Sequence, residues 1–197
     1  LVQQTIAEEQ TVTFARDDSA QAHIFKAWLA PGIRDKDYLP LSLLNSILGG
    51  GGLTSRLFLE LRDKQGLAYH VRSSYESYRH RGQVYIYIGT QASTENRDKC
   101  LQGFQIEVDK LMKEMVGTEE LEAAKRNVIG RRTIYLETAM QKASHIGTSY
   151  VQGRPVKEIQ AASERIMAVT AEDIQRVAQK YLNEPSVTSI VGPSEIL

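Results

Sequence analysis

The sequence predicts an α+β domain, in which a largely antiparallel sheet of about five strands carries a run of helices packed on one face. Three observations lead to this prediction. Short segments rich in aromatic and β-branched residues cluster in the first half of the chain, a helical pattern begins at Thr94 and continues to Leu182, and one strand-like segment follows it. Because the strands cluster and do not alternate with single helices, neighbouring strands are expected to run antiparallel.

Two short strands are expected before the first helix. Residues 1–10 are polar and are expected to form a lead-in linker. Residues 11–14 alternate between polar and apolar side chains, and residues 22–29 (AHIFKAWL) form a second strand-like segment. The Pro31–Gly32 pair that follows is a strong turn signal, so the chain is expected to reverse there.

Two helices are expected on either side of a glycine run. The first follows Asp37 and stops at the glycines, and the second is capped by Thr54 or Ser55 and ends at Gly66. Both predictions depend on apolar residues that recur at helical spacing. These residues are Leu43, Leu44, Ile47 and Leu48 in the first helix, and Leu53, Leu57, Phe58 and Leu61 in the second. The glycine run consists of Gly49, Gly50, Gly51 and Gly52.

A β-hairpin is expected after Gly66. Residues 67–75 and 83–89 are rich in Tyr and β-branched side chains, and the second segment (QVYIYIG) alternates in the manner of a strand. The polar residues 76–82 between them are expected to form the turn.

The rest of the chain is expected to be mainly helical. One amphipathic helix runs from Thr94 to the break at Gly117, and a second starts at Thr118. Thr170 and Asp173 have the spacing of a capping box, which predicts the start of the last helix. The remaining elements are three helices over residues 140–151, 155–167 and 170–182, and a closing strand over residues 186–191.

The composition is that of an ordinary globular protein, and the 197 residues are expected to form a single domain. Lys plus Arg and Asp plus Glu both number 24, so the formal net charge of zero argues against a nucleic-acid binder. No membrane insertion is expected, because no apolar run approaches the roughly 20 residues of a spanning helix. The chain starts at Leu1 and is interpreted as a processed or excised segment of a longer protein.

A catalytic metal site within this chain is not expected. An H-x-x-E-H motif brings two histidines onto one face of a helix with a carboxylate base between them. An alternative is that His70 and His80 approach each other on the hairpin, with Glu76 nearby; we interpret them as surface histidines. The four histidines are widely spaced: His23, His70, His80 and His145.

Two other chemistries have weak support. Cys100 lies in a predicted helix without a histidine close in sequence, and there is no G-x-S-x-G motif, so a cysteine or serine hydrolase is not favoured. Residues 49–56 (GGGGLTSR) lack the lysine of a phosphate-binding P-loop and follow a helix rather than a strand. The glycine run is either a helix end with a short flexible link, or backbone that approaches a ligand closely or moves.

Arg62 and Tyr69 are the last candidate pair. Arg62 lies in the final helical turn before Gly66, where a cation complements the helix dipole, and Tyr69 lies in a predicted strand, where aromatic residues are favoured. Both residues therefore have structural reasons to be present, and chemistry alone leaves a functional role open.

Residues 53–71 (LTSRLFLELRDKQGLAYHV) closely resemble a segment of the pitrilysin-type, insulinase-like zinc peptidases. In that segment a helix ends in Leu-Arg, and a Tyr follows seven positions after the Arg. The glycine run, residues 118–125 (TEELEAAK) and residues 170–182 (TAEDIQRVAQKYL) resemble the same family in the same order. The resemblance extends from about residue 22 to residue 182.

The resemblance implies a role for the Arg/Tyr pair. In this family two homologous α+β domains form one half of a shell that closes around an unfolded peptide. One domain supplies the inverted zinc motif, and the second domain of the other half supplies an arginine and a tyrosine, whose positions Arg62 and Tyr69 match. Both would stabilise the oxyanion that develops on the scissile carbonyl. The processing-peptidase relatives also imply substrate contact for Gly49–Gly52.

The resemblance also implies partners. No zinc is expected in this chain, and zinc is expected in an N-terminal zinc-motif domain, in a partner peptidase subunit of a dimer, or in both. The isolated chain is then expected to be inactive. A catalytically silent scaffold or peptide-binding subunit of the same fold is the main alternative, and an unrelated α+β interaction domain is a third. The compartment is left open, with a bacterial periplasm favoured over the cytoplasm.

Overall fold

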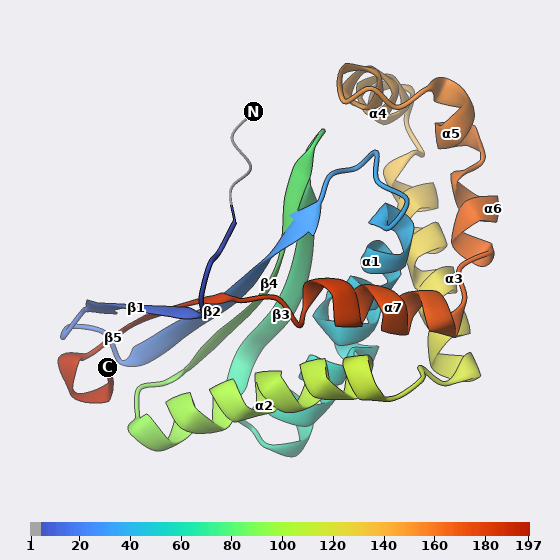
Figure 1. Cartoon of the computed structure of the whole chain (residues 1–197). Helices are drawn as coiled ribbons and strands as arrows, with labels where there is room; N and C mark the ends of the chain where they lie inside the picture. The colour runs from blue at the N-terminus through green and yellow to red at the C-terminus, as the bar shows by residue number, and fades with distance from the viewer. Residues whose placement is uncertain (1–4) are drawn as a thin grey trace.

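The computed structural model describes residues 5–197 and contains one five-stranded sheet with helices on one side of it (Figure 1). The strands lie side by side in the order β1-β5-β2-β4-β3. Of the predicted linker, residues 5–9 have no regular helix or strand and Gln10 begins β1, whereas residues 1–4 lie outside the described residues. The strands are β1 Gln10–Ala15, β2 Gln21–Pro31, β3 Ala68–Ser77, β4 Arg81–Gln91 and β5 Val187–Gly192.

Three of the four strand pairings are antiparallel, as the clustering of strands predicts. β3 and β4 form the expected hairpin, and β2 pairs with β4 along its whole length. β5 lies between β1 and β2, parallel to β1 and antiparallel to β2. The closing strand β5 therefore pairs with the first strand of the chain, β1. The predicted α+β fold with a largely antiparallel sheet is confirmed.

The two helices around the glycine run have irregular turns. α1 (Tyr38–Asn45) continues in wider π-helical turns over Ser46–Gly50 (η1), so the first helix extends into the glycines. A 3₁₀ turn, Gly52–Thr54 (η2), connects it to the second helix, which is π-helical over Phe58–Lys64 (η3). Such wide turns in a helix occur often near functional sites.

The predicted helices of the second half are present, with one difference. The helix predicted over residues 155–167 is two helices that meet at Ala161. The carbonyl oxygen of Ile159 accepts a hydrogen bond of 2.9 Å from Arg132 Nη2, which competes with the backbone bond of a continuous helix. None of the helices within residues 5–197 combines the length and apolar character that a bilayer crossing needs. The helices are α2 Thr94–Lys113, α3 Thr118–Tyr135, α4 Ala139–Val151, α5 Val156–Gln160, α6 Ala162–Met167, α7 Ala171–Tyr181 and the 3₁₀ turn η4 Ser194–Ile196.

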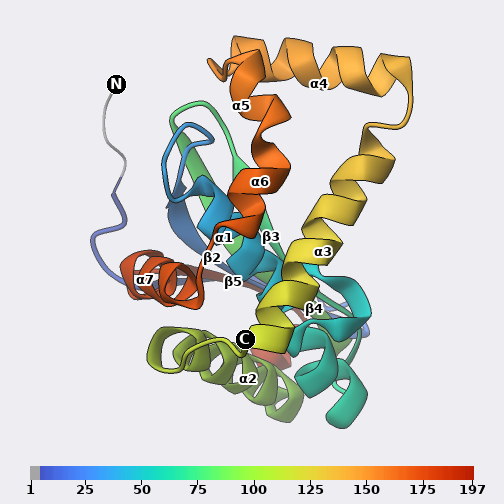
Figure 2. The same ribbon diagram turned by 90° about the vertical axis from the view of Figure 1, so that its right-hand side faces the viewer.

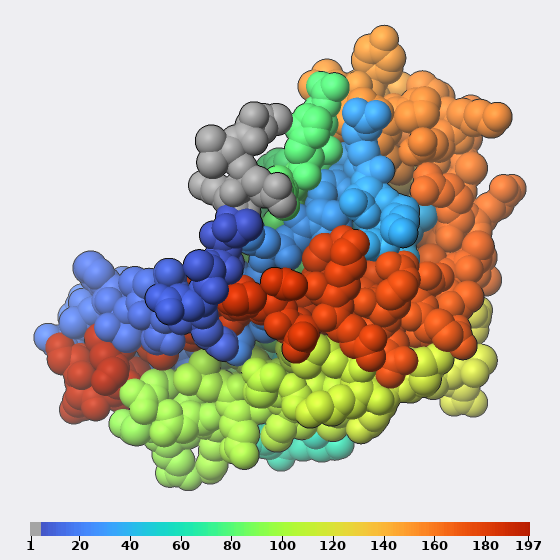
Figure 3. Space-filling view, viewed as in Figure 1, coloured from blue at the N-terminus to red at the C-terminus, as the bar shows by residue number. Residues whose placement is uncertain are grey.

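The hydrophobic core lies between one face of the sheet and the helices α1, α2 and α7. The strand register brings Ile24 opposite Ile88 and Trp28 opposite Val84 on this face. α2 and α7 pack side by side against it (Figures 1 and 3). Each such side chain stabilises the fold by about 1.5–3 kcal/mol when fully buried. The helices contribute the buried side chains Leu43, Leu44, Leu48, Phe104, Val108, Leu111, Ile174 and Val177.

The opposite face of the sheet carries aromatic and polar side chains. Phe25 on β2 stacks on Tyr85 of β4, with ring centres 4.4 Å apart. His23 Nδ1 lies 2.9 Å from the hydroxyl oxygen of Tyr87, within hydrogen-bond distance. The helices seen in Figures 1 and 2 lie on the other side of the sheet, as the sequence predicts.

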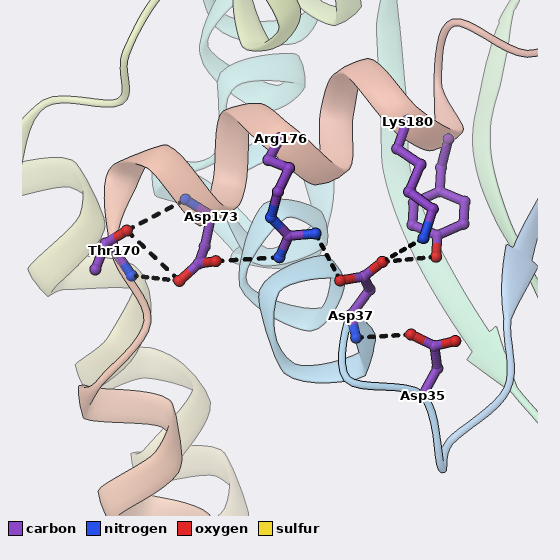
Figure 4. Close-up of polar contacts among 7 residues, drawn as sticks. Asp35, Asp37, Thr170, Asp173, Arg176 and Lys180 are labelled. Carbon is purple, nitrogen blue, oxygen red and sulfur yellow. Dashed lines mark hydrogen bonds and ion pairs between the residues drawn. The ribbon is translucent and has the colours of Figure 1, made fainter.

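A buried carboxylate fixes α7 against the start of α1 (Figure 4). Asp37 is fully buried and accepts hydrogen bonds from Arg176 Nη1 at 2.7 Å, Lys180 Nζ at 2.7 Å and the Tyr181 hydroxyl at 2.8 Å. Burial raises the pKa of Asp37, but the hydrogen bonds from Lys180, Arg176 and Tyr181 outweigh burial and lower the pKa to about 2. The carboxylate is therefore ionised at neutral pH and neutralised by two cations.

The predicted capping box at the start of α7 is confirmed. The Thr170 hydroxyl accepts from the backbone N–H of Asp173 at 3.2 Å, and the Asp173 carboxylate accepts from the backbone N–H of Thr170 at 3.3 Å. Asp173 also accepts a hydrogen bond of 3.0 Å from Arg176 Nη2. Arg176 therefore links the cap of α7 to the buried Asp37 (Figure 4).

Asp37→Asn is expected to lower the free energy of unfolding by about 1.5–3 kcal/mol, because it removes the charge from hydrogen bonds made to charged donors. Urea denaturation at pH 7 measures the change. Glu158→Gln is the matched control, because the Arg165–Glu158 pair is exposed, with 44% and 46% of the side chains accessible. The control should change the free energy by less than about 1 kcal/mol.

The stability difference between wild type and Asp37→Asn is expected to depend on pH. The pKa of Asp37 in the folded protein lies below its value of about 3.9 in the unfolded chain, so its stabilisation is present above that pH and is lost as the pH falls toward 2. The stability difference between wild type and Asp37→Asn should be constant between about pH 5 and 7 and shrink below about pH 4. An undiminished difference near pH 3 would contradict this assignment.

Candidate functional site

Arg62 and Tyr69 are brought together by a tight reversal of the chain. Arg62 lies in η3 and Tyr69 lies near the start of β3. Between them Gly66 adopts a left-handed conformation with φ of 62°, which favours glycine. The backbone N–H of Gly66 donates to the carbonyl of Arg62 at 3.1 Å, and that of Leu67 donates to Leu61 at 2.9 Å. The predicted helix end at Gly66 is therefore confirmed.

The two side chains lie in contact on the surface. The guanidinium carbon of Arg62 is 4.9 Å from the centre of the Tyr69 ring and 4.6 Å from the centre of the Phe58 ring. Cations over aromatic faces at this distance are attracted by the ring quadrupole. Tyr69 exposes 85% of its surface, and Arg62 is half-buried. The two groups therefore share one exposed location outside the apolar core.

Within residues 5–197 no carboxylate forms a salt bridge with Arg62. The nearby Glu60 pairs with Lys64, with Lys64 Nζ 2.6 Å from Glu60 Oε1. Guanidinium N–H groups point outward in the plane of the group, so stacking on two rings leaves them able to donate to an oxygen. The arrangement suits an anionic or polarised oxygen on a ligand.

Tyr69 is the extra residue of a β-bulge, which the sequence did not reveal. Ala68 pairs with Thr90 of β4 and His70 pairs with the adjacent Gly89, so Tyr69 has no partner in the register. The Thr90 hydroxyl donates to the carbonyl of Leu67 at 2.6 Å and fixes the chain just before the bulge. Bulges redirect side chains and occur often beside active sites.

Close packing explains most of the glycine run. A Cβ atom on Gly49 would lie 2.4 Å from the backbone nitrogen of Ser73, and one on Gly51 would lie 2.4 Å from a backbone oxygen of η1. Gly52 has a left-handed φ of 79°. Gly49 is buried, whereas Gly50, Gly51 and Gly52 are at least partly exposed. Contact of Gly49–Gly52 with substrate stays a prediction.

The histidines do not come together. His70 lies near the start of β3 beside Tyr87, whereas His80 lies in the turn that follows β3, close to the backbone at Gly32. The alternative of a hairpin site formed by His70, His80 and Glu76 is therefore wrong. Residues 5–197 contain no group of three or more His, Cys, Asp or Glu side chains that could hold a metal ion.

Cys100 is buried in α2, as predicted for a structural cysteine. Burial raises the pKa of its thiol to about 11, although Thr90 acts in the opposite direction. A thiol with so high a pKa is protonated at neutral pH and is a poor nucleophile. Cysteine-based catalysis by this residue is therefore disfavoured.

Comparisons with known proteins identify the family. A family model described as the peptidase M16 inactive domain matches residues 2–128. The chain belongs to the M16 peptidase family. The resemblance to pitrilysin-type zinc peptidases is therefore confirmed, and the match is to the inactive domain of that family.

The relatives of this M16 domain include bacterial zinc proteases. The zinc protease YmxG of Bacillus subtilis is 27% identical over 179 residues, which cover 91% of this chain and 43% of YmxG. A zinc protease of Rickettsia felis is 30% identical over 153 residues, which cover 78% of this chain and 36% of that protein. The M16 domain thus spans less than half the length of these relatives.

Solved structures share the fold. The peptidase M16 inactive domain from Pseudomonas fluorescens superposes with a TM-score of 0.83 at 28% identity, covering 95% of this chain and 44% of that one. A protease from Helicobacter pylori has the same TM-score at 21% identity and supports the fold alone. The M16 fold is therefore established over nearly the whole chain.

Gly49→Ala is expected to lower the free energy of unfolding of this M16 domain by about 1–3 kcal/mol, because the added methyl group would overlap the backbone of β3. Gly130→Ala in α3 is the control, since a Cβ atom there meets nothing within 4 Å. The control should be neutral or stabilise the helix by up to about 1 kcal/mol. Thermal and urea denaturation measure both, and equal effects would contradict the packing explanation.

Proposed function

We propose that this chain is the non-metal domain of a zinc-dependent endopeptidase. In this proposal Arg62 and Tyr69 bind the substrate and stabilise the oxyanion at a zinc site held by another domain or chain. The observation that supports it most is the contact of Arg62, in η3, with Tyr69 on the exposed bulge of β3, where the guanidinium carbon lies 4.9 Å from the Tyr69 ring centre. Family membership and the names of the relatives agree with it.

The two groups have the chemistry that peptide hydrolysis needs. Attack on the scissile carbonyl develops negative charge on its oxygen, and zinc, when bound in its own domain, supplies the activated water. The Tyr69 hydroxyl is a neutral donor, and the Arg62 guanidinium is a permanent cation with several N–H groups in one plane. Two fixed donors of this kind stabilise an oxyanion most when water is excluded, so a covering partner would strengthen their effect.

The zinc is proposed to lie outside this chain. No group of three potential ligands occurs within residues 5–197, and the M16 domain spans only 43% of YmxG, which is named a zinc protease. We infer that an N-terminal zinc-motif domain, a partner peptidase subunit or both complete the site. An extended, unfolded peptide is the proposed substrate. The partly exposed Gly50, Gly51 and Gly52 are proposed to contact it or to let the backbone move.

Tyr69→Phe and Arg62→Ala are expected to reduce kcat by about 10²–10³-fold each in the full-length protein assembled with its partner and zinc, because each removes one oxyanion donor. Tyr69→Phe is the sharper change, since it keeps the ring on which Arg62 stacks and removes only the hydroxyl. Hydrolysis of an unstructured fluorogenic peptide measures kcat.

Two surface variants serve as controls for this test. Tyr78→Phe removes a hydroxyl from an exposed tyrosine beyond β3, and Lys64→Ala removes a cation two residues from Arg62. Both should retain wild-type kcat and unfolding temperature. Wild-type turnover in Tyr69→Phe and Arg62→Ala would exclude the proposed role. Peptide binding without hydrolysis, with zinc and all chains present, would instead support a catalytically silent subunit.

A further inference from the structure

A cleft separate from the Arg/Tyr pair lies between α1, the end of β3 and the helices α3, α4 and α6. Its volume is about 450 Å³. Figure 2 shows how the helices that line it are arranged, with α3 and α6 in front of α1. Neither Arg62 nor Tyr69 lines this cleft, so it requires its own explanation.

The lining of the cleft is strongly cationic. Arg131, Arg132 and Arg154 contribute three permanent cations to it, and none of its lining residues is an Asp or a Glu. The acids just before α1 are engaged elsewhere. Asp37 binds Arg176, Lys180 and Tyr181, and Asp35 accepts from the backbone N–H of Asp37. The arginines of the cleft therefore lack a counter-charge among its walls.

Arg154 is the most unusual of these residues, because it is only 5% exposed. The turn after α4 fixes the backbone of Arg154. The backbone N–H of Arg154 donates to the carbonyl oxygen of Ser149 at 2.9 Å, and the preceding Gly153 has a left-handed φ of 80°. Its guanidinium lies 5.4 Å from the centre of the Tyr38 ring. No carboxylate within residues 5–197 forms a salt bridge with it. Buried charges are normally paired, so this guanidinium is suited to an anionic ligand.

Arg132 and His145 form the second part of the cleft. Arg132 donates to the carbonyl of Ile159 at 2.9 Å, and its Nη1 lies 3.2 Å from His145 Nε2. A guanidinium can only donate, so Nε2 accepts and Nδ1 carries the proton of a neutral imidazole. Burial, followed by the charges of Arg132 and Arg154, lowers the pKa of His145. His145 is therefore a neutral donor beside two permanent cations.

A third observation points to a bound group. Asn127 lines the same cleft, and its buried Oδ1 atom has no hydrogen-bond partner within residues 5–197. Buried polar atoms are almost always paired, by protein, water or ligand. An acceptor without a partner, in a cleft whose arginines form no salt bridge with the described residues, fits a ligand that has an oxyanion and a nearby N–H or O–H donor.

We propose that this cleft binds a small oxyanion, a carboxylate or a phosphate group, through the guanidinium groups of Arg132 and Arg154. Both groups form charge-assisted and often bidentate hydrogen bonds with such anions. A carboxylate would come from the C-terminus of a short peptide, whose adjacent amide supplies a donor, and a phosphate would come from a free phosphate compound. The proposal is independent of the role of Arg62 and Tyr69.

The test is a titration followed by NMR of histidine ¹³Cε1, with His145 assigned by His145→Gln. The arms are inorganic phosphate, an N-acetylated dipeptide acid and the corresponding dipeptide amide, all at constant ionic strength with chloride. Phosphate, the dipeptide acid or both should shift the His145 signal and leave the signals of His23 and His70 unchanged. The compound that causes the shift identifies the source of the oxyanion. An equal response to the amide, or no response in any arm, would overturn the proposal.

Variants provide the second readout, by calorimetric titration with the anion that binds. Arg154→Gln and Arg132→Gln should each weaken binding by about 10- to 100-fold, as expected for loss of one hydrogen bond between charged groups. Arg165→Gln, an exposed arginine of α6 outside the cleft, is the matched control and should bind like wild type. Wild-type affinity in both cleft variants would overturn the proposal. If a cleft variant fails to fold, the NMR titration of the wild-type protein tests the proposal on its own.

Discussion

The ionised carboxylate of Asp37 is the interaction on which the arrangement of the helical layer depends. It is fully buried at the entrance to α1 and binds three donors from α7. Because α7 leads directly into β5, and β5 pairs with both β1 and β2, this contact also sets the position of the strand that joins the chain ends. A charge without a partner would be costly there, so the fold requires α1 and α7 to meet.

The candidate site is positioned by a glycine turn and by apolar packing, and not by a buried charge. The left-handed Gly66 reverses the chain, and Leu61 and Leu67 are buried on either side of the reversal. The core therefore fixes the backbone next to Arg62 and Tyr69, while their side chains remain outside it. A rigid support beneath an exposed pair is what a preorganised donor site requires.

Much of this fold could be predicted from periodicity and turn chemistry. Local signals were sufficient for the hairpin, for the capping box at Thr170 and for the helix end at Gly66, because each depends on residues within a few positions. The sequence did not reveal the long-range contacts. The pairing of Asp37 with α7, the break at Ala161 beneath Arg132 and the bulge at Tyr69 all depend on partners that are distant in sequence or on strand register. The family resemblance led us to expect Arg62 and Tyr69 at one site, whereas the stacking contact between them was not predicted.

The bulge at Tyr69 has a consequence beyond the direction of one side chain. β3 lies at one edge of the sheet, and an unpaired edge allows other strands to add to it and start aggregation. An extra residue interrupts the regular spacing of outward N–H and C=O groups, and charged residues such as Arg72 and Glu76 follow along the same edge. The irregularity that exposes Tyr69 thereby also limits uncontrolled growth of the sheet in the direction of β3.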